Sequence, residues 1–336
     1  MEDIRPPVVI ILGRTASGKS SFGVEVARRL GSSIISVDSL QVYREFSVVS
    51  DKISSSETGG VRHYGIDILE PSEELNVATF LEYAVQIVND ELNAGRSPIV
   101  VGGTNMYIDK LLFTSRFDHE SPITDSDPSV SMSDRIYTPE HLREVDPVMA
   151  ERLHQNDKRR IARAIDYFYD TGRQLSQALR TQTRELRWPK SVVIVKTPED
   201  DASIDDRIRE RITSKMISSG GLERELHEIQ NLVLGGKLRW NKGLLQAIGY
   251  REFQDYITQR IDTGVGDKAL FDQAVEEMTR NTIRYAKKQL KWIKKLESYI
   301  EVINVEKFGE DVIDKIKSHG PLRVKSVPQW QSSIHN

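Results

Sequence analysis

The feature that most constrains this chain is a glycine-rich segment that directly follows a short apolar run. Residues 8–12 are all aliphatic, as in a buried strand, and the run stops at Gly13. Residues 13–20 read Gly-Arg-Thr-Ala-Ser-Gly-Lys-Ser, which fits the pattern G-x-x-x-x-G-K-[ST] at each fixed position. The spacing of apolar residues over 20–30 predicts a helix after the segment. This order of strand, loop and helix indicates a loop whose backbone amides bind phosphate.

The fixed residues of this loop each have a physical role in holding phosphate. Gly13 and Gly18 let the backbone curl so that its amides point inward. Lys19 adds a positive charge at the terminal phosphate, and the Ser20 hydroxyl is a ligand for Mg²⁺. A glycine-rich turn without any ligand is the alternative interpretation.

The apolar run at 98–101 ends without an acidic residue. In most nucleotide hydrolases and kinases with such a loop, an acidic residue after a further buried strand holds the metal ion. Here residues 102–104 are Gly-Gly-Thr. This ending argues against hydrolysis of a nucleoside triphosphate, although it does not exclude it.

Alternating strand and helix patterns predict an α/β fold with a parallel sheet covered by helices on both faces. Further strands are expected at 33–37, 98–101 and 192–195, and helices at 77–92, 141–186 and 204–233. The stretch 118–139 is rich in Ser, Asp and Pro, which predicts a loop or linker. We therefore expect a core at 1–117, a helical insertion at 118–188, a second part of the core with a basic helix at 189–305, and a C-terminal tail at 306–336.

Composition excludes several classes of protein. The 336 residues include no cysteine, which rules out disulfides, cysteine-based zinc sites and thiol catalysis. No apolar run approaches the roughly 20 residues that a membrane-spanning helix needs. The apolar run that begins at Val8 leaves no room for a signal peptide before it. We expect a monomeric cytoplasmic protein without membrane contact, and nuclear or mitochondrial pools stay open.

Positive charge is concentrated in two segments, although the formal net charge is −3. Between residues 280 and 295 there is no acidic residue, and the cations are Arg280, Arg284, Lys287, Lys288, Lys291, Lys294 and Lys295. A second group consists of Lys158, Arg159, Arg160 and Arg163. Such clusters suit the phosphates of a nucleic acid. Two solvated helix faces are the alternative interpretation.

Asp38 directly follows the second expected strand. Ligand sites in open parallel sheets gather at the carboxyl ends of the strands, so this carboxylate is a candidate for a site residue. An aspartate that only caps a turn is the alternative.

Several segments, in their order along roughly residues 8–295, resemble tRNA dimethylallyltransferases. They are Gly13 to Ser20, Asp38 to Tyr43, Val101 to Tyr107, Asp146-Pro147, Asn156 to Arg160, Gln246 to Glu252, and Arg284 to Gln289 with Trp292. Each segment is weak evidence by itself, whereas the ordered set is specific.

The resemblance implies a P-loop NTPase-like parallel sheet with an inserted all-helical tRNA-binding domain. It also implies a reaction: transfer of a dimethylallyl group from dimethylallyl diphosphate to N6 of the adenine next to the tRNA anticodon, with release of diphosphate. In that family the loop binds the diphosphate of the donor rather than a nucleotide. The expected partner is the tRNA anticodon stem-loop, and the expected cofactor is Mg²⁺ on Ser20.

The resemblance also assigns roles to residues. It makes Asp38 the general base, with Thr104 beside it and Lys19 at the leaving group. The diphosphate is expected on Gly13, Arg14, Thr15, Ala16, Ser17, Gly18, Lys19, Ser20 and Arg251. Contacts with tRNA, in which Gln41 positions the adenine, are expected from Asp38, Ser39, Leu40, Gln41, Thr104, Arg159, Arg160, Ile161, Ala162, Arg163, Gln246, Gly249, Tyr250, Arg251, Arg284, Lys287 and Lys288.

The sequence departs from the family pattern at a few positions. Arg14 stands where the family commonly has proline, and the paired histidines after the second strand appear as His63-Tyr64. The C-terminal block often begins Thr-Arg, whereas here Ile283 follows Thr282. Which basic residue of the 280–295 helix reaches the diphosphate therefore stays open. The C-terminal zinc finger of many eukaryotic members cannot be built without cysteine.

The residues suit the chemistry of prenyl transfer to an adenine. The exocyclic amine becomes acidic only as the new C–N bond forms, and a carboxylate such as Asp38 can take its proton at that moment. Lys19, Mg²⁺ and the loop amides would stabilise the charge that builds on the leaving diphosphate.

Three other functions stay open. An adenylate isopentenyltransferase, which makes free cytokinin nucleotides, would use the same donor site, although the basic helical region at 141–186 favours tRNA as the acceptor. A P-loop small-molecule kinase would transfer phosphate from ATP. A non-catalytic RNA-binding module would tolerate the loss of Asp38 and Lys19.

Overall fold

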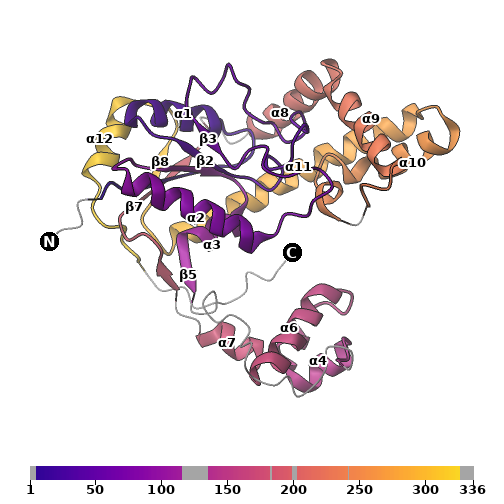
Figure 1. The fold of residues 1–336 in the computed structure, drawn as a ribbon, viewed down its shortest axis with the longest axis horizontal. Coiled ribbons are helices and arrows are strands. Elements are labelled where there is room, and N and C mark those ends of the chain that lie inside the picture. The colour runs from indigo at the N-terminus through magenta and orange to yellow at the C-terminus, as the bar shows by residue number, and fades with distance from the viewer. Residues whose placement is uncertain (1–4, 116–134, 182–183, 199–202, 241, 326–336) are drawn as a thin grey trace. The chain divides into compact units, whose positions relative to one another are not determined.

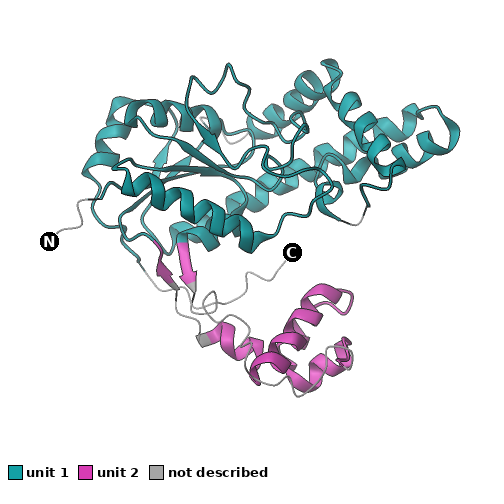
Figure 2. Ribbon diagram, in the orientation of Figure 1, with its two compact units in different colours: residues 1–112, 188–325 teal, residues 113–187, 326–336 magenta. Residues whose placement is uncertain are grey.

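The computed structural model describes residues 5–115, 135–181, 184–198, 203–240 and 242–325. The chain forms two compact units, which Figure 2 colours separately. Residues 1–112 and 188–325 belong to the first unit, and the described part of the second lies within 113–187. In the described residues, no helix combines the length and apolar character needed to cross a bilayer.

The first unit contains a six-stranded sheet in which all pairs are parallel. Its strands are β1 (Val8–Leu12), β2 (Ile34–Val37), β3 (His63–Tyr64), β4 (Ile99–Gly102), β7 (Ser191–Lys196) and β8 (Ile303–Val305). Their spatial order is β3-β2-β4-β1-β7-β8. The strands β1, β2 and β4 are buried along their whole length, which fits a sheet covered on both faces.

Helices cover both faces of this sheet (Figure 1). On one face lie α1 (Lys19–Leu30) and α12 (Glu310–Ser318), and on the other α2 (Val77–Asn93) and α3 (Asn105–Leu112). The sheet packs against α1 and α12 through a core that includes Val26, Val101 and Ile313. Because the strands are parallel and β1 is central, the loops after β1, β2 and β4 open at one edge of the sheet.

A helical extension of the first unit follows β7. It consists of α8 (Ser203–Glu210), the π-helix η3 (Arg211–Ser218), α9 (Gly221–Leu234), the short 3₁₀ turns η4 (Gly243–Gln246) and η5 (Arg251–Phe253), α10 (Gln254–Thr263) and α11 (Lys268–Glu297). The long helix α11 runs from the α9–α10 end of this extension back to the sheet (Figure 1).

The second unit contains four helices and an antiparallel strand pair in its described part. The pair is β5 (Phe113–Ser115) with β6 (Arg184–Leu186), and the helices are α4 (Pro139–Val145), α5 (Pro147–Arg152), α6 (Lys158–Thr171) and α7 (Leu175–Thr181). Leu142, Met149, Ile161 and Ile165 form part of its hydrophobic core. The expected loop at 118–139 falls mostly outside the described residues.

Two expectations of local structure are wrong. Residues 184–186 do not continue a helix but pair as β6 with β5, a partner about 70 positions earlier that no local pattern reveals. The expected C-terminal tail from residue 306 contains α12, which buries Val312, Ile313 and Ile316 against the α1 side of the sheet. Apolar residues at this helical spacing need a surface to pack against, so this part of the chain belongs to the core.

We expect Asp146 to be the main polar support of the second unit. Its carboxylate has no solvent exposure; Oδ1 accepts a hydrogen bond from the Met149 amide (3.1 Å), and Oδ2 one from the Ser176 amide (2.8 Å). Asp146→Ala removes an N-cap and leaves the buried Ser176 amide unpaired. It should lower the free energy of unfolding by roughly 2–4 kcal/mol.

Asp157→Ala is the matched control, because Asp157 caps the exposed start of α6 through the Arg160 amide (3.2 Å). Its expected cost is about 1 kcal/mol. Thermal unfolding and amide hydrogen exchange in α5 and α7 measure both variants. Equal losses for the two would contradict the role of Asp146.

Candidate active site

The glycine-rich segment forms the connection between β1 and α1, as its sequence predicts. Ala16 and Gly18 have positive φ angles of 61° and 79°, which turn the backbone sharply. A Cβ atom on Gly13 would lie 2.5 Å from Ser17 Oγ, so a larger residue does not fit there. Gly18 has no side chain with which to cap α1. The first amides of the helix are therefore available to an anion.

Lys19 is the first residue of α1, and its amine is buried beside the loop. Within the described residues it forms no ion pair with a carboxylate. Burial lowers the pKa of Lys19, the nearby Arg211 lowers it further, and the charges of Asp38 and Asp51 act in the opposite direction. A positive charge in this position would be stabilised by a phosphate ligand.

Arg211 is a site residue that the sequence pattern missed. It begins the π-helix η3, and such segments often occur at functional sites. Its Nη1 donates to Asp51 Oδ2 (3.0 Å) and to Thr15 Oγ1 of the loop (3.2 Å). Its Nε is buried without a hydrogen-bond partner in the described structure. This guanidinium therefore lies at the loop with a donor still unused.

Asp38 lies at the end of β2, and one of its oxygens is committed to the local turn. Oδ1 accepts a hydrogen bond from the Leu40 amide at 2.9 Å, so the turn-capping interpretation holds for that atom. The hydrogen bonds of the described residues leave Oδ2 without a partner. The same carboxylate influences the pKa of Lys19 and of Tyr285. Asp38 therefore faces the loop and α11 at once.

The turn after β4 approaches the same place. The carbonyl of Gly103 accepts a hydrogen bond from the Tyr285 hydroxyl of α11 (3.1 Å). Burial and the Asp38 charge raise the pKa of Tyr285 to about 12, while Thr104 and Gln289 act in the opposite direction as hydrogen-bonding neighbours. Thr104 and Asp38 thus both act on the Tyr285 hydroxyl, and the role of Thr104 beside the general base stays a prediction.

Gln41 is held by the protein's own groups. Its Oε1 accepts a hydrogen bond from Ser36 Oγ (2.7 Å), and its Nε2 donates to the carbonyls of Ser50 and Asp51 (3.3 Å each). Among the described residues, one lone pair of Oε1 is left without a hydrogen bond.

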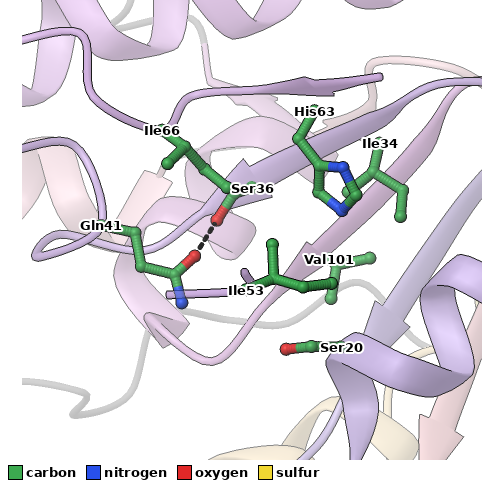
Figure 3. Close-up of a pocket in the computed structure, with 8 residues that line it drawn as sticks. All are labelled: Ser20, Ile34, Ser36, Gln41, Ile53, His63, Ile66 and Val101. Atoms are coloured by element: carbon green, nitrogen blue, oxygen red, sulfur yellow. Dashed lines mark hydrogen bonds between the residues drawn. The ribbon is translucent and has the colours of Figure 1, made fainter. Parts of the chain in front are cut away.

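A small cavity lies beside Gln41 (Figure 3). It is lined by Ser20, Ile34, Ser36, Gln41, Ile53, His63, Ile66 and Val101. Its volume of about 20 Å³ admits one water molecule but no five-carbon group. Burial lowers the pKa of His63, whose Nδ1 lies 2.9 Å from the Val61 carbonyl. This ring is therefore neutral near pH 7, with Nδ1 as the donor.

The predicted segment at 246–251 contacts the loop before Asp51 through Tyr250 and Glu225. Tyr250 is fully buried, and its hydroxyl donates to Glu225 (2.9 Å). Glu225 also accepts from the amides of Val48 and Val49 (2.6 and 3.1 Å). The Tyr250 side chain therefore fixes the loop that precedes Asp51 and does not face solvent.

Arg251, which the resemblance predicts to hold diphosphate, is paired within its own segment. Its Nε pairs with Glu252 Oε1 (2.8 Å), and it forms no hydrogen bond with the loop in the described part of the chain. Gly249, with φ 104°, leaves no room for a Cβ, which would lie 2.3 Å from Val49 Cγ1. This glycine is needed for packing.

The predicted basic residues lie on two helices. Arg159, Arg160 and Arg163 are exposed on α6 of the second unit, whereas Ile161 is buried in its core. Arg284, Lys287 and Lys288 are exposed on α11. Lys287 lies 3.7 Å from Asp205, and Arg284 donates to Asn281 (2.9 Å).

These features are typical of an α/β enzyme with a glycine-rich loop after β1, a lysine at the start of the following helix and a carboxylate at the end of β2. The sequence matches the IPP transferase family over residues 41–296 and the isopentenyl transferase family over residues 6–70. It is 33% identical to the tRNA dimethylallyltransferase of Bacillus cereus, over 96% of this chain and 97% of that one. The chain therefore belongs to the IPP transferase family.

Solved structures share the fold. The tRNA delta(2)-isopentenylpyrophosphate transferase of Staphylococcus epidermidis is 27% identical, with a TM-score of 0.59 over 93% of this chain and 99% of that one. A eukaryotic dimethylallyltransferase acting on tRNA has a TM-score of 0.69 at 24% identity, covering 86% and 70% of the two chains. This second likeness concerns the fold alone.

The lowered pKa of Lys19 predicts a pH dependence of donor binding. Only the ammonium form attracts a diphosphate, and a bound anion raises the pKa of Lys19 again. Affinity for dimethylallyl diphosphate should therefore be full below the lowered pKa and fall as the pH rises through it. The second phosphate ionisation lies near pH 6, so the donor's own charge is constant above neutrality.

Lys19→Arg is the test, because a guanidinium stays protonated at alkaline pH. The variant should lose the alkaline fall in affinity, whatever its affinity at neutral pH. Titration calorimetry at increasing pH measures this directly. An equal fall in wild type and variant would show that Lys19 is not the titrating group.

Proposed function

We propose that this protein transfers a dimethylallyl group from dimethylallyl diphosphate to N6 of the adenine next to the tRNA anticodon and releases diphosphate. Membership of the IPP transferase family supports prenyl transfer. The observation that carries the proposal is the meeting of a phosphate loop, the buried amine of Lys19 and the carboxylate of Asp38 at one edge of the sheet.

The donor side of the reaction needs positive charge where the diphosphate leaves. This positive charge comes from Lys19, the amides at the start of α1 and Arg211. No covalent intermediate with the protein is needed. Such preorganised positive charge contributes most where negative charge builds on the leaving group in the transition state. Asp51 orients Arg211 through their ion pair (3.0 Å) and leaves its Nε for a ligand.

The site suits a Mg²⁺ ion that would be held by few protein ligands. No cluster of three or more His, Asp or Glu side chains occurs among the described residues. Mg²⁺ commonly binds through one or two protein groups together with substrate phosphates and water. The exposed Ser20 hydroxyl beside Lys19 would hold it, and the ion would neutralise charge on the leaving diphosphate.

The acceptor side needs a base for the amine proton. Asp38 Oδ1 is fixed by the Leu40 amide, which orients the carboxylate and leaves Oδ2 for the proton. Thr104, which acts on the Tyr285 hydroxyl, and Gln41, which is held by Ser36, are the groups that would position the adenine. A direct displacement requires the amine and the prenyl carbon to be aligned in one cavity.

The exposed arginines of α6 and cations of α11 supply the proposed contacts with tRNA. A free nucleotide would need neither, so these residues favour tRNA over adenylate as the acceptor. Tyr250 and Ile161 are buried and Arg251 pairs with Glu252, so these side chains would support the residues that contact tRNA rather than contact it themselves. A monomeric state and a cytoplasmic location stay predictions.

Asp38→Asn should slow transfer by about 10²- to 10⁴-fold, because an amide cannot take the proton. The asparagine oxygen can still accept from the Leu40 amide, so the turn should persist. Single-turnover transfer and tRNA binding are the measurements, and tRNA affinity should stay nearly unchanged. Asp255→Asn, at an exposed position on α10, controls for the loss of charge. Turnover of Asp38→Asn within a few-fold of wild type would show that Asp38 is not the general base.

Replacing Arg159, Arg160 and Arg163 with alanine should raise KM for a tRNA anticodon stem-loop and leave any transfer to AMP unchanged. Each lost phosphate contact should flatten the salt dependence of binding by roughly one unit or slightly less. Steady-state transfer to both acceptors at two salt concentrations measures the effect.

A triple variant of equal charge provides the control: alanine at Arg28, Arg29 and Lys315, which are exposed on α1 and α12. If both triple variants modify the stem-loop as well as wild type, α6 is not a tRNA contact. The adenylate alternative would then be favoured.

A further inference from the structure

Gln289 of α11 is a buried side chain that joins two parts of the site. It is 2% exposed. Its Oε1 accepts a hydrogen bond from the Thr15 amide of the phosphate loop (2.8 Å), and its Nε2 donates to the Gly103 carbonyl (2.9 Å). The carbonyl oxygen of this amide thus accepts from the phosphate loop, and its NH₂ group donates to the turn that precedes Thr104.

The turn and the loop touch each other at this point. A Cβ atom on Gly103 would lie 2.5 Å from Gln289 Nε2, 3.4 Å from the Gly13 carbonyl oxygen and 3.5 Å from Lys19 Cε. The turn therefore packs directly on the loop and on the stem of Lys19. Any shift of Gly103 moves Thr104, its neighbour in the chain.

Tyr285 supports the same turn from one helical turn earlier. Its hydroxyl donates to the second lone pair of the Gly103 carbonyl (3.1 Å). Residues four apart lie on the same face of a helix, so Tyr285 and Gln289 form one surface toward the site. Tyr285 reaches only the turn, whereas Gln289 reaches both the turn and the loop.

We infer that Gln289 is a positioning residue that fixes the distance between the diphosphate loop and the Asp38–Thr104 side of the site. This inference rests on the proposed function. Transfer without a covalent intermediate needs the reacting atoms about 3–3.5 Å apart, and a misplacement of about 1 Å can cost about 10²-fold in rate. Gln289 thus meets the diphosphate loop with a neutral amide.

The chemistry of the two contacts explains why an amide is needed. A carboxylate could accept from Thr15 but would meet the Gly103 carbonyl with a lone pair. An ammonium or guanidinium has no acceptor for the Thr15 amide. Only a side chain with one donor and one acceptor satisfies both groups, and a buried group left unpaired is costly.

The alternative is that Gln289 only fills the core. Gln289→Met keeps the length of the side chain and loses both hydrogen bonds. We expect its single-turnover rate, per folded enzyme and with saturating donor and tRNA, to fall by about 10²-fold. Donor affinity should change much less, because Lys19 and the amides of α1 remain. Ile293→Val, a buried change one turn further along α11, is the control for lost stability and should keep the wild-type rate.

Gln289→Glu separates positioning from folding. A protonated carboxyl group can accept from Thr15 and donate to Gly103, whereas the ionised form cannot donate. Burial against a carbonyl raises the pKa of such a group. Relative to wild type, the Glu variant should therefore gain activity as the pH falls, whereas the Met variant should not.

Two outcomes would overturn the inference. One is a Gln289→Met rate within threefold of wild type on folded enzyme. The other is a Gln289→Glu profile parallel to that of wild type, which applies even if the Met variant does not fold. Failure of the proposed function is a separate result, since wild type itself would then transfer no prenyl group.

Discussion

The positive charge of Lys19 at the start of α1 is the interaction on which the site depends. Burial disfavours this charge, and no carboxylate in the described chain pairs with it. Arg211 adds a second cation at Thr15, with Asp51 holding it in place. Such an arrangement is costly without a ligand and favourable with an anion, which supports the proposed binding of the diphosphate here. The other elements of the proposed site would position the prenyl group that is attached to this anion.

The glycines after β4 show how packing decides the chemistry. A Cβ on Gly102 would lie 2.4 Å from the Val37 carbonyl oxygen, and Gly103 packs against Gln289 and Lys19. No acidic side chain fits where many nucleotide-binding loops place one. The turn instead brings Thr104 to Tyr285, on which Asp38 also acts, and Asp38 keeps one oxygen without a hydrogen bond in the described chain. Close backbone contact thus stands after β4 where many proteins with such a loop have a metal-binding acid.

Local patterns predicted the elements whose signals are local. The run 8–12, the glycine pattern and Asp38 at a strand end are all found where the sequence places them. Arg211 and Gln289 reach Thr15 from 196 and 274 residues away, a relation that no spacing along the chain encodes. Tyr250 and Ile161 lie within segments predicted to contact tRNA, yet their side chains are buried, since a matching segment does not say which residues face outward. The helix α12 was missed because its partner surface lies on α1.

The most direct test of this account is incubation of the protein with dimethylallyl diphosphate labelled in its prenyl group, together with tRNA, AMP or ATP in separate reactions. The account predicts that label moves to tRNA without added ATP, that one diphosphate is released for each label transferred, and that adding ATP does not raise the rate. A requirement for ATP, or label appearing in AMP but not in tRNA, would contradict it.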